Sequence, residues 1–197
     1  MIRTFVAIEL DASLRKALAQ VQADLRSRLQ KAMGPDVRIQ WVKPESVHLT
    51  LKFLGDIPEE RVPDIEAALA RVTGAHTRCT VDVGGLGVFP DARAPRVLWV
   101  GLSGQVEGVT RLATAVERAL VALGFAPEPK PFNPHLTLAR IKERSHDIGR
   151  ALAAGHMLEP AAPIGTVMVN AIALVKSELK PSGAMYTKLC EVSLKEA

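Results

Sequence analysis

The sequence is poor in cysteine, and it contains no long hydrophobic run. Two cysteines, Cys79 and Cys190, are too few for a disulfide framework and lack the spacing of a metal-binding motif, which fits a reducing compartment. No apolar segment reaches the roughly 18 residues of a membrane-spanning helix, and the first residues lack the apolar stretch of a secretory signal peptide. We therefore expect a cytoplasmic protein with no membrane association.

Aromatic residues and glycine-rich phosphate-binding motifs are also scarce. Neither Gly-x-Gly-x-x-Gly nor a P-loop occurs among the 14 glycines, which argues against the usual dinucleotide-binding and NTPase folds. Aromatic residues make up only 4% of the chain, and we expect most of them in the core, with one or two near enough to a cleft to stack on a nucleobase. The net charge of +4 fits an anionic ligand, and it fits a basic surface that keeps the protein in solution equally well.

The hydrophobic fraction of the chain, 48%, supports a packed core, and the order of its expected elements predicts an α+β fold. Each half runs through strand, helix, strands, helix and strands, without a regular β-α-β alternation, so antiparallel pairing is expected. The first helix has leucines at helical spacing and Asp11 or Ser13 as its N-cap. The expected strands are 2–9, 37–42, 47–54, 77–89, 95–102, 164–175 and 184–193, and the expected helices are 12–32, 59–72, 105–123 and 146–154, with a turn at 180–183.

One tetrapeptide, His-Leu-Thr-Leu, occurs twice, at residues 48–51 and 135–138. A chain with 5 histidines is not expected to repeat such a segment by chance, so an internal duplication explains it better. The second histidine follows the first by 87 residues (135 − 48), slightly less than half of the chain. This spacing favours two related lobes of one domain over a solenoid of short repeats.

The two copies each carry a histidine and a threonine two residues apart, and each is expected to form a strand. Side chains alternate between the two faces of a strand, so His48 and Thr50 share one face and the leucines share the other. The same holds for His135 and Thr137. Two such strands facing each other would surround one cleft with two histidines and two hydroxyls.

Paired histidines suit general acid–base chemistry at a phosphodiester. Imidazole has a pKa near 6.5, so one ring can deprotonate an attacking water while the other protonates the leaving alkoxide. Threonine hydroxyls can donate to the non-bridging oxygens, where negative charge accumulates. Strict alternation also puts Lys52 on the face of His48, as a weaker candidate for binding the phosphate, and turns Arg140 away from His135 unless the strand has a bulge.

Zinc binding is the competing interpretation of the two histidines. A third protein ligand with suitable spacing is missing, and threonine is a poor zinc ligand, so we expect no metal and no cofactor. A single His-x-Thr strand would most often be structural. The second, matching copy is what favours catalysis.

The chain resembles the two-histidine (2H) phosphoesterase superfamily, and within it the RNA 2′,3′-cyclic phosphodiesterases of the 2′-5′ RNA ligase (LigT-like) family. The resemblance spans nearly the whole chain, through segments that include the opening strand at 5–8, the first repeat at 48–55, the segments 95–101 and 132–140, and the tail at 174–186. It implies a single domain over residues 1–197, made of two interleaved lobes related by a pseudo-two-fold axis. Antiparallel sheets flanked by helices would leave an active-site groove between the lobes.

The resemblance further implies an enzyme that hydrolyses RNA 2′,3′-cyclic phosphate ends to 2′-phosphomonoesters without a metal. His48 and His135 would be the acid–base pair, with Thr50 and Thr137 binding the phosphate. The working assignment is His48 as acid and His135 as base, although the near-symmetry of the site leaves the two roles open. RNA with cyclic phosphate ends, such as tRNA fragments, is the expected partner of a monomeric protein. A 2′-5′ RNA ligase activity and a non-catalytic RNA-binding module are the alternatives.

Overall fold

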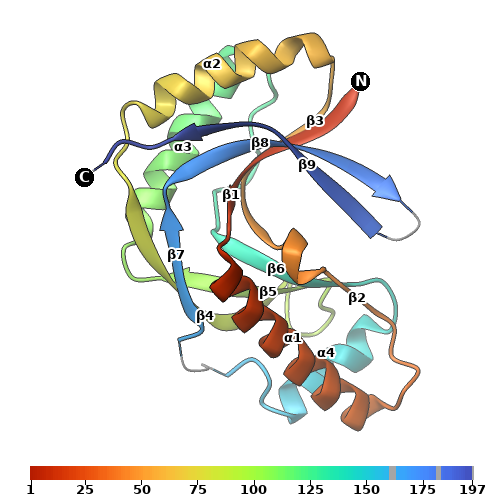
Figure 1. The fold of residues 1–197 in the computed structure, drawn as a ribbon. Coiled ribbons are helices and arrows are strands. Elements are labelled where there is room, and N and C mark those ends of the chain that lie inside the picture. The colour runs from red at the N-terminus through yellow and green to blue at the C-terminus, as the bar shows by residue number, and fades with distance from the viewer. Residues whose placement is uncertain (160–162, 181–182, 197) are drawn as a thin grey trace.

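The computed structural model describes residues 1–159, 163–180 and 183–196, which form a curled sheet with helices on its outer side (Figure 1). The strands are β1 (Ile2–Glu9), β2 (Ile39–Trp41), β3 (His48–Ile57), β4 (Cys79–Phe89), β5 (Val97–Ser103), β6 (His135–Ile141), β7 (Gly165–Val169), β8 (Ala171–Lys180) and β9 (Gly183–Ser193). The helices are α1 (Ala12–Met33), α2 (Val62–Thr73), α3 (Val106–Ala122) and α4 (Ser145–Ala154), with short 3₁₀ turns at Pro44–Ser46 and Glu59–Arg61.

All the named strands belong to one antiparallel sheet, in the order β7-β4-β5-β6-β3-β1-β8-β9, and β2 pairs with β6 beside this path. The centre of the order lies between β6 and β3, the two strands that carry the repeated tetrapeptide. Going outwards, β3, β1, β8 and β9 form one half of the sheet, the His48 half. The strands β6, β5, β4 and β7, with β2, form the other, the His135 half.

The helices divide between the two halves, but not in chain order. Helices α2 and α3 contact each other and mainly strands of the His48 half, although α3 also contacts β4, whereas α1 contacts α4 and β7 on the His135 half (Figure 1). Thus α1 follows a strand of the His48 half and yet covers the His135 half, and α3 does the reverse. The predicted α+β class with duplicated lobes is confirmed, and the sheets of the two lobes are continuous with each other.

Packing of aliphatic side chains holds the sheet against the helices. The four leucines of the repeats are buried, as the alternation predicted, together with Leu14, Leu18, Leu25 and Leu29 of α1. Each fully buried leucine stabilises the fold by about 1.5–3 kcal/mol.

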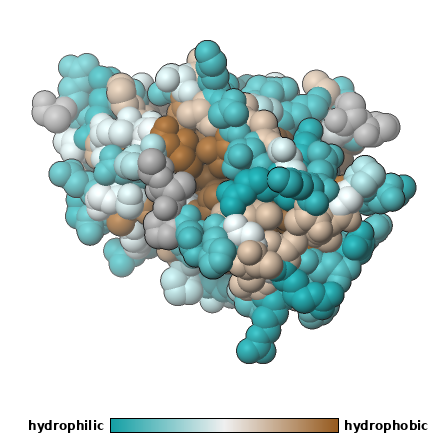
Figure 2. All heavy atoms as spheres, turned by 90° about the horizontal axis from the view of Figure 1, so that it is seen from below, coloured by the Kyte–Doolittle hydropathy of each residue, from teal (hydrophilic) through white to brown (hydrophobic). Residues whose placement is uncertain are grey.

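Asp11 is the N-cap of α1, since its carboxylate accepts a hydrogen bond from the Leu14 amide at 2.7 Å. The outer surface of α1 and α4, seen from below in Figure 2, is largely hydrophilic, with hydrophobic surface gathered near its middle.

One predicted strand, 164–175, is wrong in a way that affects the whole architecture. The chain leaves the His135 half at Asn170, so that β7 pairs with β4 and β8 pairs with β1. Both segments are hydrophobic, and the sequence pattern contains no signal for the change of partner. Of the turn predicted at 180–183, residues 181–182 lie outside the described residues.

Candidate active site

The two repeats meet at the centre of the sheet, where β3 and β6 pair antiparallel at Leu49 and Leu136. One step to either side of this pair, the antiparallel register sets His48 against Thr137, and Thr50 against His135. Each histidine is therefore opposite the threonine of the other copy. The two histidines occupy diagonal positions, which lie roughly 7–8 Å apart in a regular antiparallel ladder. A phosphate group fits between two side chains at that separation.

A bulge follows the threonine in both strands. Along β3 and β1, Thr50 pairs with Ala7 and Lys52 with Val6, so Leu51 is the extra residue. Along β6 and β5, Leu138 is the extra residue, at the equivalent position of the second repeat. A bulge places two consecutive residues opposite one partner, and it shifts the alternation of every residue that follows.

The catalytic candidates His48 and His135 are held in the same way. Nδ1 of His48 lies 2.8 Å from the Ser46 carbonyl oxygen, and Nδ1 of His135 lies 2.8 Å from the Asn133 carbonyl oxygen. A carbonyl oxygen only accepts hydrogen bonds, so Nδ1 must carry the proton in both rings. The other nitrogen, Nε2, is left to take up or release a proton.

Aromatic side chains surround both imidazoles. The ring of His48 stacks on Phe5, with centroids 4.6 Å apart, and Tyr186 of β9 meets it edge-on at 5.2 Å. His135 lies against Phe89, at 5.0 Å, and near Trp99. Phe5 is buried, but Phe89, Trp99 and Tyr186 lie next to the two histidines and are not fully buried. For these three rings the expectation of a place in the core is wrong.

Its surroundings change the acidity of His48. Burial lowers its pKa below that of an ordinary imidazole, and the hydrogen bond to Ser46 opposes this effect. The positive charges of Arg140 and Arg15 lower the pKa further, while Glu9 raises it. The net result is a histidine that is more easily kept neutral than a free one.

The structure turns Arg140 to the face of the catalytic candidates, which alternation alone did not predict. Because of the bulge at Leu138, Arg140 returns to the face of His135 and Thr137. It pairs with Val97 on one side and Gln40 of β2 on the other. Burial raises the pKa of Tyr186, and the positive charges of Arg140 and Arg3 oppose that rise.

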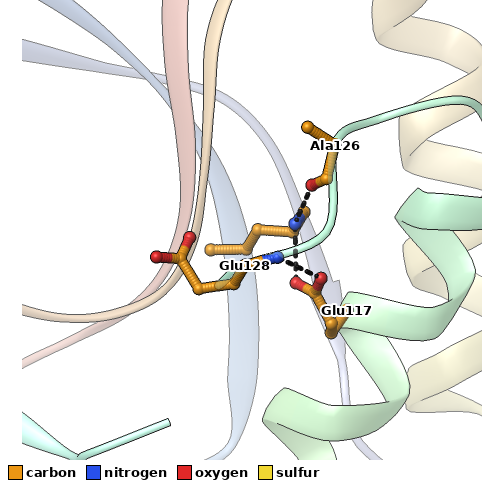
Figure 3. A network of polar contacts seen from close by, with 4 residues as sticks. Glu117, Ala126 and Glu128 are labelled. Atoms are coloured by element: carbon orange, nitrogen blue, oxygen red, sulfur yellow. Dashed lines mark hydrogen bonds and ion pairs between the residues drawn. The ribbon is translucent and has the colours of Figure 1, made fainter. Parts of the chain in front are cut away.

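The equivalent bulge at Leu51 of β3 turns Lys52 away from the face of His48 and Thr50. The ammonium of Lys52 is buried on the helix side of β3, where it donates to a Glu117 carboxylate oxygen at 2.6 Å and to the Ala126 carbonyl at 2.9 Å. Figure 3 shows this network, in which Glu117 also accepts a hydrogen bond from the Glu128 amide. The prediction of Lys52 at the phosphate does not fit this position.

Glu117 is the charged partner that compensates for the burial of Lys52. Desolvation raises the pKa of its carboxyl, but the hydrogen bonds from Lys52 and the Glu128 amide, with the nearby positive charge, bring it below the ordinary value. Its side chain is 27% exposed, against 1% for Lys52. Water can therefore reach the carboxylate much more easily than the ammonium.

This difference in exposure predicts an unequal cost of removing the two charges. Lys52→Met leaves a carboxylate that water can hydrate, so we expect a loss of about 2 kcal/mol in the free energy of unfolding. Glu117→Gln leaves a buried ammonium without a counter-charge and should cost more, about 3 kcal/mol or above. Urea unfolding of both variants tests the order. A larger loss for Lys52→Met would contradict it.

Two other features of the described residues bear on function. No group of three or more His, Cys, Asp and Glu side chains in this part of the chain could hold a metal ion. No helix within it is long and apolar enough to cross a membrane. The metal-independent mechanism stays a prediction.

Comparison with known proteins bears on both repeats. The family model described as LigT-like phosphoesterase matches the chain twice, at residues 8–99 and 100–186, so that each match contains one copy of the tetrapeptide. The chain is 31% identical to the RNA 2′,3′-cyclic phosphodiesterase of Methanothermobacter thermautotrophicus, over 95% of this chain and 96% of that one. It is 34% identical to the protein of the same description from Aquifex aeolicus, over 87% and 90%.

Solved structures share the fold. A crystal structure of a protein from Thermus thermophilus superposes with a TM-score of 0.76 at 31% identity, covering 99% of each chain. The crystal structure of E. coli LigT complexed with 3′-AMP also superposes with a TM-score of 0.76, covering 99% of each chain. Its identity of 23% supports the likeness of the fold alone.

Proposed function

Since the chain belongs to the LigT-like phosphoesterase family, we propose that it hydrolyses 2′,3′-cyclic phosphate ends of RNA to 2′-phosphomonoesters. The observation that carries this proposal is the register at Leu49 and Leu136, which brings two equivalent His-x-Thr half-sites together across one antiparallel pair. Acid–base catalysis of an in-line displacement needs two proton-transfer groups on opposite sides of phosphorus. The two copies provide one group each.

In the proposed reaction one histidine takes a proton from water through Nε2 as the water oxygen attacks phosphorus. The bond between phosphorus and the 3′-oxygen breaks, and the other histidine gives its Nε2 proton to that oxygen. The hydroxyls of Thr50 and Thr137 donate to the non-bridging oxygens, and the guanidinium of Arg140 compensates their negative charge. The product keeps its phosphate on the 2′-oxygen.

The environment of His48 favours it as the base. This reverses the working assignment made from the sequence, in which His48 is the acid and His135 the base. Because burial and two nearby guanidinium groups lower its pKa, His48 is largely neutral at pH 7 in the free protein and ready to accept a proton. A base must be neutral, so kcat/KM falls as the pH drops through its pKa. We expect this acid limb below the ordinary imidazole value of about 6.5.

A pH–rate profile, with NMR titration of the His48 ring, checks this expectation. The midpoint of the acid limb should match the titration of His48 in the free protein, because kcat/KM reports the free enzyme. An acid limb above the ordinary value, following the titration of the other ring, would return the base role to His135.

The proposed function is tested with a short RNA that ends in a 2′,3′-cyclic phosphate. We expect a 2′-phosphate product, formed equally well with and without EDTA. Loss of activity in EDTA, with recovery on adding zinc, would move the mechanism to a metal. Chromatography also separates the 3′-phosphate and the 2′-5′ ligated dimer. The absence of every product, together with tight binding of the RNA, would favour a non-catalytic binding module.

A further inference from the structure

One buried polar side chain interrupts the leucine series of α1. Leu14, Leu18, Leu25 and Leu29 recur at helical spacing and are buried, and Gln22 stands in the same series with only 6% of its surface exposed. Burying an amide costs free energy unless hydrogen bonds within the protein replace those to water. A leucine would suit this helix better on hydrophobic grounds alone, so the glutamine calls for specific partners.

The partners of Gln22 are two backbone carbonyl oxygens on other elements. Its Nε2 donates to the Val42 carbonyl oxygen at 2.7 Å and to the Leu138 carbonyl oxygen at 2.9 Å. A carbonyl oxygen only accepts, so the NH2 end of the amide, which carries two hydrogens, must face both. One side chain of α1 thereby joins the residue after β2 to the middle of β6, although Leu138 follows Gln22 by 116 residues.

Leu138 is the extra residue of the bulge in β6. Its carbonyl oxygen already accepts a hydrogen bond from the Val42 amide at 2.9 Å, which is enough to satisfy it. The second bond, from Gln22, is therefore not needed to pair that oxygen. It fixes the position of the bulged residue relative to α1, at the point where the alternation of the strand shifts.

Arg140 depends on this bulge for its direction. Leu138 and Ala139 are consecutive and both fully buried in the core, and this irregularity returns Arg140 to the face of His135 and Thr137. A guanidinium on a long side chain reaches one defined position only if the backbone that carries it is fixed. A contact that holds the bulge therefore also determines where the charge of Arg140 lies.

The histidine of the first repeat is held by other contacts. His48 pairs with Glu9 of β1, its ring stacks on Phe5, and its Nδ1 donates to the Ser46 carbonyl oxygen. The bond from Gln22 to the bulge leads to Arg140 instead.

We propose that Gln22 is a positioning residue for the phosphodiester reaction, which acts through the bulge at Leu138 to hold the guanidinium of Arg140 at the phosphate. The inference rests on the proposed function and adds to it a residue of α1, on the helix side of the sheet. The alternative is a structural role, in which Gln22 only stabilises the junction of α1, β2 and β6. The two roles differ in whether the effect of Gln22 requires Arg140.

Gln22→Met removes the donor and keeps an unbranched side chain that suits a leucine series. On a short RNA that ends in a 2′,3′-cyclic phosphate, we expect kcat to fall roughly tenfold to hundredfold, as for small misplacements of a group in an active site. KM should change less than about twofold, because Arg140 acts on charge that develops in the transition state. In an Arg140→Ala background the same substitution should not lower kcat further, since no guanidinium is left to position.

Titration of the His48 ring by NMR reads the position of Arg140 without turnover. Because the charge of Arg140 lowers the pKa of His48, Gln22→Met should raise that pKa, in the same direction as Arg140→Ala. In the Arg140→Ala background it should not move the pKa again. That background also separates out Arg15, which lies on α1 and lowers the same pKa.

The matched control is Gln20→Met, which changes an exposed glutamine of the same helix and should alter neither kcat nor the His48 titration. Thermal unfolding shows whether each variant is folded, and Gln22→Leu, which continues the leucine series, is a second variant with the same expected results. Equal losses of kcat in the two backgrounds, or an unchanged pKa of His48, would overturn the inference. If the wild-type protein does not hydrolyse the RNA, the proposed function fails, and the His48 titration alone decides whether Gln22 positions Arg140.

Discussion

Replacing either His48 or His135 by alanine should lower kcat for a cyclic phosphate substrate by about 10²–10⁴-fold. Each ring carries one of the two proton transfers, and both are oriented by a backbone carbonyl through Nδ1. The double variant should be little worse than either single one, because an acid and a base that act in one step lose their joint effect when one is removed. Single-turnover kinetics on a short RNA that ends in a 2′,3′-cyclic phosphate measures all three variants.

The comparison needs a check on folding, since the His48 ring stacks on Phe5. Thermal unfolding of each variant separates lost packing from lost chemistry. His146→Ala is the matched control, because that histidine is exposed on α4. Turnover within tenfold of wild type in either single variant would contradict the acid–base mechanism. Losses that multiply in the double variant would show that the two histidines work in separate steps.

Replacing Arg140 by alanine should lower kcat by about 10²–10³-fold, the usual effect of removing one preorganised donor from developing charge. Arg140→Lys should recover only part of this loss, since a single ammonium cannot match the two parallel hydrogen bonds of a guanidinium. The alanine variant should also raise the pKa of His48, because the charge of Arg140 helps to lower it.

The second readout separates a role at the phosphate from a structural one. Arg118→Ala removes an exposed charge of the same type from α3 and serves as the control for both measurements. If the rate falls while the pKa of His48 stays in place, Arg140 acts through the fold and not through its charge. An unchanged rate would exclude it from the site.

The sequence predicted the part of the site that depends on local alternation. His48, Thr50, His135 and Thr137 share one face, with the leucines buried beneath them, because these residues precede the irregularity in each strand. The placement of the four side chains relative to each other required the pairing at the centre of the sheet. Their catalytic roles remain predictions.

Residues after the bulge could not be placed in the same way. Lys52 was expected in the groove, and Arg140 was expected outside it unless a bulge intervened; one extra residue per strand reverses both. A bulge is a property of two paired strands, and the residue types at Leu51 and Leu138 give no signal for it. The change of partner at Asn170, within the strand expected at 164–175, is likewise a property of strand pairing. It could not be read from the hydrophobic pattern of that one segment.

The exchange of helices between the halves means that neither half of the chain holds a complete core of its own. The helix that follows the first strand of each repeat, α1 after β1 and α3 after β5, contacts the half to which that strand does not belong, although α3 also contacts β4 of its own half. A chain of half the length would thus leave the helix side of part of its sheet exposed to solvent. It could bury that surface only by exchanging helices with a second copy. The exchange of elements between two equivalent halves has the geometry of a domain swap, here within a single polypeptide. Two fragments produced by cutting the loop between β4 and β5 should depend on each other in the same way. Neither fragment should fold until it is mixed with the other.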